Sequence, residues 1–215
     1  MVLNEGVLKK VIKSAYNIGH LHMGKRDGKY ILAGTWWFIE INESNLSNKI
    51  KAAIMELTGL LPERGEFYEC SKEDIQMEFP DVAVGVLDKA AEFLMPIEWK
   101  KTKILIEKAS YITRIYQHPE KEKTDTEGKI AVNELIVDLL KGKLIETDDP
   151  NINGPGVMKY GSKTNTLIWK NRDWILAVGA MEMIQQSSKI SGDFLKEERV
   201  YMDIAKLDLI KGTNV

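Results

Sequence analysis

Residues 19–25 (GHLHMGK) carry the residue types that could bind a phosphate or a metal ion. Their glycines and lysine have the spacing of a phosphate-binding loop, but Arg26 stands where a serine or threonine would hold magnesium, and a helix is predicted where a strand should precede the loop. His20 and His22 could ligate a metal, yet such a site needs a third ligand, and His118 is the only other histidine. A surface turn is therefore the favoured interpretation, and a nucleotide enzyme using His20, His22 and Lys25 is a weaker alternative.

The remaining reactive side chains predict no catalytic set. Cys70 is the only cysteine, so no internal disulfide can form, and no histidine adjoins it in the sequence to activate the thiol. Asp148, Asp149 and Asp173 could attract a cation, although acidic loop residues are usually only solvated. No nucleophile, base and orienting group can be assembled from the sequence. We therefore expect a protein that is not an enzyme and that uses no cofactor or metal.

The composition is that of an ordinary globular protein. The 215 residues suffice for one large domain or for two units of about 100 residues each. Lysine and arginine number 30 against 32 acidic residues, and the net charge of −2 predicts no general attraction to nucleic acid. No apolar run approaches the ~20 residues that span a bilayer, and the charged start of the chain does not resemble a signal peptide. We expect a cytoplasmic protein with no membrane partner.

The first 81 residues alternate between helical and strand-like patterns. Apolar residues recur at helical spacing at the start of the chain and leave Lys9, Lys10 and Lys13 on the outer side. Aromatic and β-branched residues then indicate a strand, and Asn45 or Ser47 can cap a helix that stops at Gly59. The predicted elements are a helix over 3–18, a turn over 24–28, a strand over 30–41, a helix from 45 or 47 to 57, and a hairpin over 65–77.

The rest of the chain repeats this order. The predicted elements are a helix over 82–94, a strand over 103–116, a loop over 118–128, a helix over 130–141, an insertion or long loop over 143–164, a hairpin over 166–178 and a helix over 191–210. The aligned segments are 7–12 with 86–91, 31–41 with 105–115, and 53–59 with 136–142. The sequence therefore predicts an α+β protein with two tandem domains, 1–81 and 82–190, in which helices pack on antiparallel sheet, followed by a helix and tail over 191–215.

Several segments of both units resemble the DNA sliding clamps, the processivity rings of replicative polymerases. In the first unit the resemblance rests on residues 8–18, on 27–32, and on the helix ending at 60–63 before the hairpin and residues 79–80. In the second unit it rests on residues 87–95, 104–115, 130–136 and 167–184. Bacterial clamps have three domains per chain. A chain with two such domains is similar to the archaeal, eukaryotic and phage clamps, in which three subunits form the ring.

The resemblance implies a non-catalytic processivity factor of two clamp-like domains that encircles duplex DNA and tethers DNA polymerase or other replication proteins to it. It also implies a homo-oligomeric ring, assembled by edge-strand pairing, whose basic helix faces contact phosphates without reading the bases. The candidate DNA-binding residues are Lys9, Lys10, Lys13, Lys49, Lys51, Lys89 and Lys141. The candidate partner-binding residues, where a replication protein would insert a short apolar peptide, are Phe79, Pro80, Met181, Met183 and Ile184.

Two alternatives stay open beside the clamp. The lysines fit an ordinary solvated surface equally well, and Glu56, Asp88 and Asp138 place negative charge among the supposed lining. The main alternative is a non-enzymatic adaptor or regulator, of phage or mobile-element origin, that binds a partner protein through the predicted helix over 191–210. The other is the nucleotide enzyme considered above.

Overall fold

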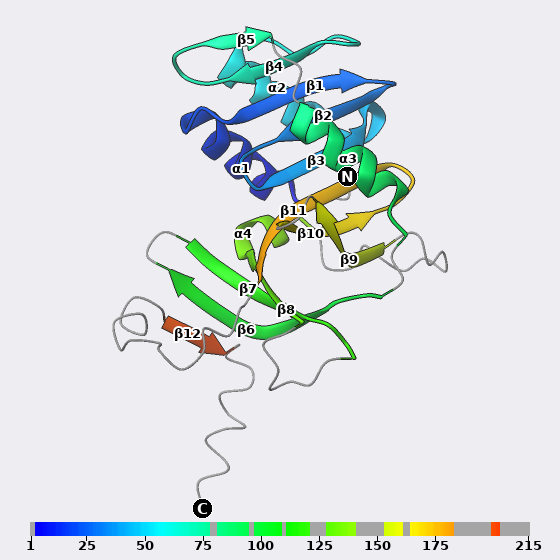
Figure 1. Cartoon of the computed structure of the whole chain (residues 1–215). Coiled ribbons are helices and arrows are strands. Elements are labelled where there is room, and N and C mark those ends of the chain that lie inside the picture. Colours follow the sequence, from blue (N-terminus) through cyan, green and yellow to red (C-terminus); the bar gives the residue numbers. More distant parts are fainter. Residues whose placement is uncertain are drawn as a thin grey trace, which may run out of the picture.

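The protein is an α+β structure in which helices cover both faces of a long antiparallel sheet (Figure 1). The computed structural model describes residues 3–77, 81–94, 97–108, 111–120, 128–140, 153–160, 164–182 and 199–202. The helices are α1 (Glu5–Asn17), α2 (Asn48–Thr58), α3 (Asp81–Glu92), the short α4 (Glu134–Val137) and a 3-10 turn, η1 (Glu43–Asn45). The strands are β1 (Leu21–Arg26), β2 (Lys29–Ala33), β3 (Trp37–Asn42), β4 (Phe67–Cys70), β5 (Ile75–Met77), β6 (Lys100–Lys108), β7 (Tyr111–Gln117), β8 (Lys129–Asn133), β9 (Asn153–Tyr160), β10 (Thr164–Lys170), β11 (Trp174–Glu182) and β12 (Arg199–Met202). The predicted α+β class is confirmed.

Strand β11 holds the sheet together because it pairs with three other strands. Its first part, Trp174–Val178, pairs with β3, and its last residues, Met181 and Glu182, pair with β8. Its other edge pairs with β10, which in turn pairs with β9. The full order is β12-β6-β7-β8-β11-β3-β2-β1-β4-β5, with β10 and β9 branching from β11. Both predicted units therefore contribute strands to one continuous sheet.

The largest apolar cluster also crosses the predicted boundary between residues 81 and 82. It includes Ile12 of α1 and Ile39 of β3 from the first unit, together with Val132 of β8 and Leu176 of β11 from the second. All four side chains are essentially inaccessible to solvent. The residues on the two sides of the predicted boundary thus share a sheet and a core.

Helices α1 and α2 begin and end where side-chain chemistry predicts. Asn4 accepts hydrogen bonds from the backbone N–H groups of Gly6 and Val7, at 3.1 and 3.4 Å, and so caps α1. Ser47 caps α2 in the same way, and Gly59 ends α2 with a left-handed φ of 72°. Both helices bury one apolar side against the sheet and each other. The predicted helices over 3–18 and from Ser47 to residue 57 are confirmed to within a residue or two.

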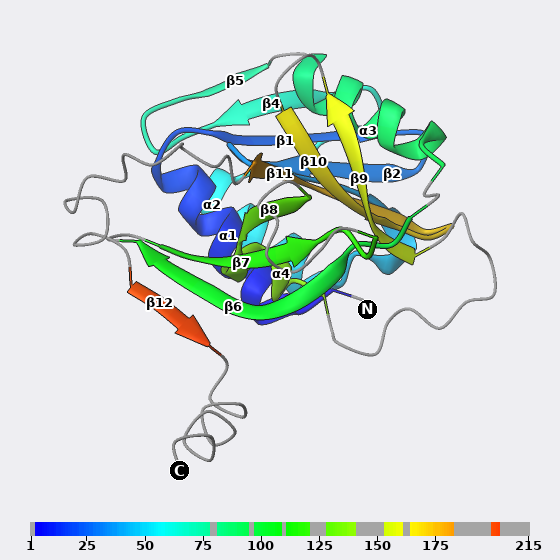
Figure 2. The same ribbon diagram turned by 60° about the horizontal axis from the view of Figure 1, so that its bottom comes forward.

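Helix α3 lies on the opposite face of the sheet from α1 and α2 (Figure 2). Neighbouring side chains of a strand point to opposite faces, so Leu32 packs in the cluster under α1 and α2 while Ile31 packs against Leu87 of α3. The Lys170 ammonium of β10 donates to three carbonyl oxygens at the end of α3, those of Ala90, Ala91 and Phe93, at 3.0, 2.8 and 2.6 Å. These bonds satisfy the exposed carbonyls of the helix end and anchor α3 to the sheet.

An ion-pair network attaches the side of α3 to the same face. Arg26 donates to Glu40 at 2.8 Å and reaches Asp88 of α3 at 2.6 Å. Lys29 donates to the other oxygen of Glu40 at 2.7 Å. These partners raise the pKa of Arg26 against the lowering effect of its burial. The network therefore links α3 to β1, β2 and β3 by charge as well as by apolar packing.

Some predicted elements prove to be two elements or a different one. The strand over 30–41 is the pair β2 and β3, and the strand over 103–116 is the pair β6 and β7. The helix over 130–141 is wrong at its start, because β8 pairs there with β7 and β11 before the short α4 begins. The hairpins over 65–77 and 166–178 are confirmed as β4–β5 and β10–β11.

Besides β8, three further strands lie where none was predicted. Strand β1 extends through Gly24, where a turn was expected, because Gly24 pairs with Ile31 of β2 and with Phe67 of β4. The Phe67 ring occupies the space that a side chain at Gly24 would need. Strand β9 lies within the segment predicted as an insertion or long loop over 143–164. Strand β12 pairs with β6 within the helix predicted over 191–210, so that helix is wrong at residues 199–202. The rest of that predicted helix lies outside the described residues.

Candidate functional site

Four of the predicted DNA-binding lysines are exposed on the layer formed by α1 and α2, which pack against each other. Lys9, Lys10 and Lys13 follow the outer side of α1, and Lys49 lies in the first turn of α2. None of the four forms an ion pair with any residue that the structure describes. We call these four residues the lysine face.

The other candidate lysines do not join the lysine face. The Lys51 ammonium is half-buried, lies 3.9 Å from Glu43 and sits over the Tyr30 ring at 5.5 Å. Lys89 is exposed on α3, on the far side of the sheet. Lys141 lies outside the described residues. Of the acidic residues that oppose the clamp interpretation, Asp88 is paired with Arg26, whereas Glu56 is exposed on α2.

The predicted partner-binding site is largely outside the part of the chain that the structure describes. This applies to Phe79, Pro80, Met183 and Ile184. Met181 is placed in β11, where it pairs with Ala131 of β8. The structure therefore does not test whether these five residues lie close together.

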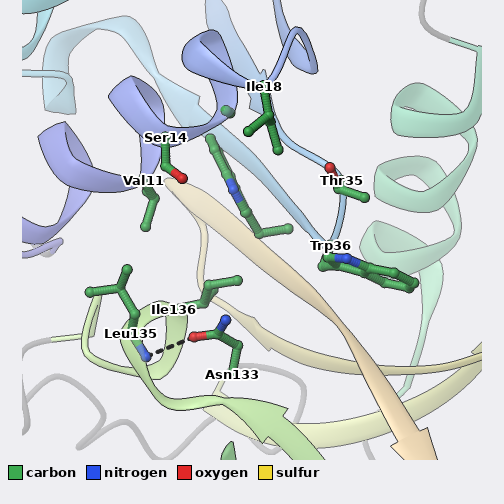
Figure 3. A pocket seen from close by; sticks show the side chains of 10 residues that line it. Val11, Ser14, Ile18, Thr35, Trp36, Asn133, Leu135 and Ile136 are labelled. Carbon is green, nitrogen blue, oxygen red and sulfur yellow. Dashed lines mark hydrogen bonds between the residues drawn. The ribbon is translucent and has the colours of Figure 1, made fainter. Parts of the chain in front are cut away.

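A small hollow that was not predicted lies beside α1, and we call it the α1 groove (Figure 3). Its volume is about 120 Å³. It is bordered by α1, by the turn between β2 and β3, and by the start of α4 (Figure 3). The lining residues are Val11, Ser14, Ala15, Ile18, Thr35, Trp36, Trp37, Asn133, Leu135 and Ile136. No charged residue is among them.

Large apolar side chains are exposed around the α1 groove. The exposed fractions are 60% for Ile18, 61% for Trp36 and 40% for Leu135. Trp36 is nevertheless held in place: its carbonyl accepts from the N–H of Gly179 at 2.8 Å, and a Cβ at Gly179 would lie 3.2 Å from the indole. The indole therefore rests on the backbone of β11, and this side of the rim is organised without a ligand.

Polar groups on the walls of the α1 groove are available for a ligand. The side-chain oxygen of Asn133 accepts from the N–H of Leu135 at 3.0 Å, as the dashed line in Figure 3 shows. The amide nitrogen of Asn133 and the hydroxyls of Ser14 and Thr35 form no hydrogen bond with the described residues. The groove thus combines an apolar floor with a few unoccupied polar groups.

The residues considered as phosphate or metal ligands contact different partners and do not form one site among the described residues. The ammonium of Lys25 donates to Glu43 at 2.8 Å, and this bond raises the pKa of Lys25 and lowers that of Glu43. His22 lies across from Glu69 on the neighbouring strand, 3.8 Å away, and His118 packs edge-on against Trp99. Among the described residues no three side chains of the metal-ligating types come together.

The surroundings of Cys70 and Asp173 indicate structural roles for both side chains. Cys70 is fully buried at the end of β4, and this burial raises the pKa of its thiol to about 11. Such a thiol is rarely ionised near neutral pH, so it lacks the property that makes a cysteine nucleophilic. Asp173 accepts a hydrogen bond from the side chain of Asn42 at 3.0 Å, whereas Asp148 and Asp149 lie outside the described residues.

Comparisons of the chain with models of known protein families, with curated proteins and with solved structures find no match. The resemblance to sliding clamps therefore stays a prediction. None of the helices in the described part of the chain is both long and apolar enough to cross a bilayer. The lysine face and the α1 groove are the two surface features of the described residues that could bind a partner.

Proposed function

We propose that this protein is a non-catalytic tether, which binds the phosphate backbone of DNA through the lysine face and holds a partner protein beside it. The observation that carries the proposal is the outer side of α1, where Lys9, Lys10 and Lys13 project into solvent without an ion-pair partner among the described residues. Glu5, in the first turn, is the only acidic residue of α1. Lysines in this setting keep their charge available for phosphates and read no base sequence.

The size of the expected effect follows from counterion release. If the four lysines of the lysine face each neutralise one phosphate, the logarithm of the affinity falls against the logarithm of salt concentration with a slope of about −3.6. Raising the salt from about 50 to 200 mM then weakens binding by roughly 150-fold. An incidental attraction between the protein and DNA has a much shallower slope, because the net charge of the chain is −2.

The test is a salt titration of DNA binding by fluorescence anisotropy, with a labelled duplex of arbitrary sequence. We expect the variant with Lys9, Lys10 and Lys13 all changed to glutamine to lose most of the slope and most of the affinity. A matched control changes Lys72, Lys100 and Lys103 to glutamine, because these lysines are also exposed but lie outside the α1–α2 layer. Equal losses in the two variants would reduce the effect to net charge and would overturn the proposal.

The sliding-clamp form of the proposal adds a ring. Strands β5 and β12 end the described sheet, so their outer edges are the positions at which neighbouring subunits would pair. Analytical ultracentrifugation and retention on circular compared with linear DNA test this form. A strict monomer with equal loss from both DNA topologies would contradict the ring without affecting backbone binding by the lysine face.

The α1 groove favours a second candidate, a protein-binding adaptor that makes no contact with DNA. Its exposed tryptophan and isoleucine are typical of surfaces that bind proteins. This candidate replaces the first if no DNA binding is detected at low salt while a partner still binds. The partner would then contact the α1 groove and not the predicted docking helix, because residues 199–202 of that predicted helix form a strand.

A further inference from the structure

We infer that the chain between β11 and β12, residues 183–198, packs across the part of the sheet formed by β6, β7 and β8, on the same side of the sheet as α3. This segment lies outside the described residues, and its place follows from the strands at its two ends and from the surface between them. Neither DNA binding by the lysine face nor a ligand in the α1 groove is required.

The directions of the strands require a crossover between β11 and β12. Every neighbouring pair from β11 through β8, β7 and β6 to β12 is antiparallel, so β12 runs parallel to β11. Parallel strands cannot be joined by a hairpin and need a connection of about a dozen residues or more that passes over one face of the sheet. At ~4.8 Å per strand the two strands lie about 19 Å apart, and residues 183–198 can span more than about twice that distance.

The handedness of crossovers selects the α3 side of the sheet. The N–H of Gly179 donates to the carbonyl of Trp36, so it points to the edge of β11 on which β3 and β8 pair. Ala177, two residues earlier, has the same orientation, and its side chain packs in the cluster under α3. In a strand of L-residues that runs upward, a residue whose side chain faces the viewer directs its N–H to the right. Seen from the α3 side, β8 and β12 therefore lie to the right of β11, and a right-handed crossover, the hand of about 98% of such connections, passes over this side.

The surface that the crossover must traverse is apolar. Ile106 of β6, Ile115 of β7 and Ala131 of β8 form a cluster of their own, separate from the cluster under α3. Ala131 lies opposite Met181, which faces the same side of β11 as Ala177, so the cluster is on the α3 side. Helix α3 packs on β3 and β11 and lies over the other part of the sheet (Figure 1). No apolar residue of another described element packs against the cluster, whereas an apolar sheet face needs a second layer.

The connecting segment has the composition that such a layer needs. Its large apolar residues are Met183, Ile184, Ile190, Phe194 and Leu195. Met183 and Ile184 then pack within the chain and do not receive a peptide of a replication protein, as the resemblance to sliding clamps implies for them. The crossover also fixes β12 to its own chain, so its pairing with β6 closes a layer of the fold.

The test is paramagnetic broadening of the isoleucine methyl signals in the full chain, with Cys70→Ala removing the native thiol. A nitroxide is attached to the cysteine of Ser191→Cys. We expect the methyl signals of Ile106 and Ile115 to lose most of their intensity and that of Ile54, which is buried on α2 on the other side of the sheet, to keep it. The control is a nitroxide at Lys72→Cys, in the exposed loop between β4 and β5, which should leave Ile106 and Ile115 unchanged.

A pair of substitutions within the segment gives a second measurement. Phe194→Ala should lower the equilibrium constant of folding at least about tenfold, because it removes a large side chain from the contact with the sheet. The control Lys196→Ala changes a charged residue of the same segment and should alter this constant by less than about twofold. If Phe194→Ala does not fold, the broadening experiment decides, because it leaves Phe194 intact.

Three outcomes would overturn the packing of residues 183–198 on this face. The first is unchanged signals of Ile106 and Ile115 with the nitroxide at position 191, and the second is equal effects of Phe194→Ala and Lys196→Ala on stability. The third is broadening in a mixture of isotope-labelled chains without nitroxide and unlabelled chains with it, which would assign the face to the segment of a second copy. DNA binding enters none of these readouts, so failure of the lysine face is distinguishable from failure of the crossover.

Discussion

Glu40 brings a carboxylate into the face of the sheet that α3 covers, and its side chain is only 5% exposed. Arg26 and Lys29 both donate to it. We expect Glu40→Gln to lower the free energy of unfolding by about 2–3 kcal/mol, because it leaves two cations without their shared partner in a partly buried site. Asp88→Asn should cost less than about 1 kcal/mol, because the Asp88 side chain is 54% exposed.

Urea unfolding followed by circular dichroism measures both variants. The ratio of the two effects is the informative quantity, since each removes one carboxylate charge from the same network. Equal losses would mean that burial does not determine the strength of these ion pairs, contrary to this account of how α3 is held.

Cys70 provides a pH-dependent prediction. Its thiol has a pKa of about 11 in the folded protein, against an ordinary value of 9.0. Between pH 9 and 11 the unfolded chain therefore releases this proton while the folded chain keeps it, so stability falls as the pH rises. From pH 8.5 to 10.5 the loss due to Cys70 is about 2 kcal/mol.

The Cys70→Ala variant isolates this effect from other groups that titrate in the same range. It should be less stable at pH 8.5, because it removes a buried sulfur, but it should lose about 2 kcal/mol less than the wild type between the two pH values. If the free energy of unfolding of the two proteins depended on pH in the same way, burial would not have raised the pKa of the thiol.

At the scale of single elements, we expect substitution by alanine to have opposite effects on stability at Gly59 and at Gly6. Gly59 has a φ of 72° at the end of α2, and a Cβ there would contact nothing within 4 Å, so Gly59→Ala tests backbone strain alone and should cost about 1 kcal/mol. Gly6 lies in the first turn of α1, where Gly6→Ala should stabilise the protein by a few tenths of a kcal/mol. Thermal denaturation should therefore shift in opposite directions, and a shared direction would contradict the helix ends described here.

The sequence predicts elements well where local chemistry decides them. Asn4, Ser47 and Gly59 cap helices by bonds within a few residues, so α1 and α2 can be placed from the pattern alone. The predictions at Gly24 and at residues 130–133 are wrong because contacts with distant parts of the chain determine the structure there. Gly24 is tolerated in a strand because Phe67 fills its place, and residues 130–133 become a strand because β7 and β11 supply partners distant in the chain.

The lysine face can be predicted from local sequence, whereas the α1 groove cannot. The periodicity of one helix is enough to place Lys9, Lys10 and Lys13 on its outer side. The groove brings together residues 11–18, 35–37 and 133–136, whose proximity depends on how β11 joins the sheet. No local pattern in these three segments indicates a shared surface.

At the scale of the whole molecule, the position of β11 predicts an order of local stability. Its backbone pairs on both edges, whereas β5 is three residues long and, among the described strands, pairs with β4 alone. In native-state hydrogen exchange, we expect the amides of β11 and β3 to exchange slowest, with a free energy close to that of global unfolding, and those of β5 to exchange fastest among the strands from β1 to β5. Comparable protection in β5 and β11 would contradict a sheet organised around β11.

The pairing of β3 with β11 has a consequence during synthesis. Strand β3 ends at Asn42, but the segment that covers its open edge is complete only at Val178. At ~5–20 residues per second, roughly 7–27 s separate the two events on the ribosome. During this interval the apolar edge of β3 can pair with other nascent chains. Slower initiation or co-expressed chaperones should therefore raise the yield of folded protein more than stabilising the finished sheet would.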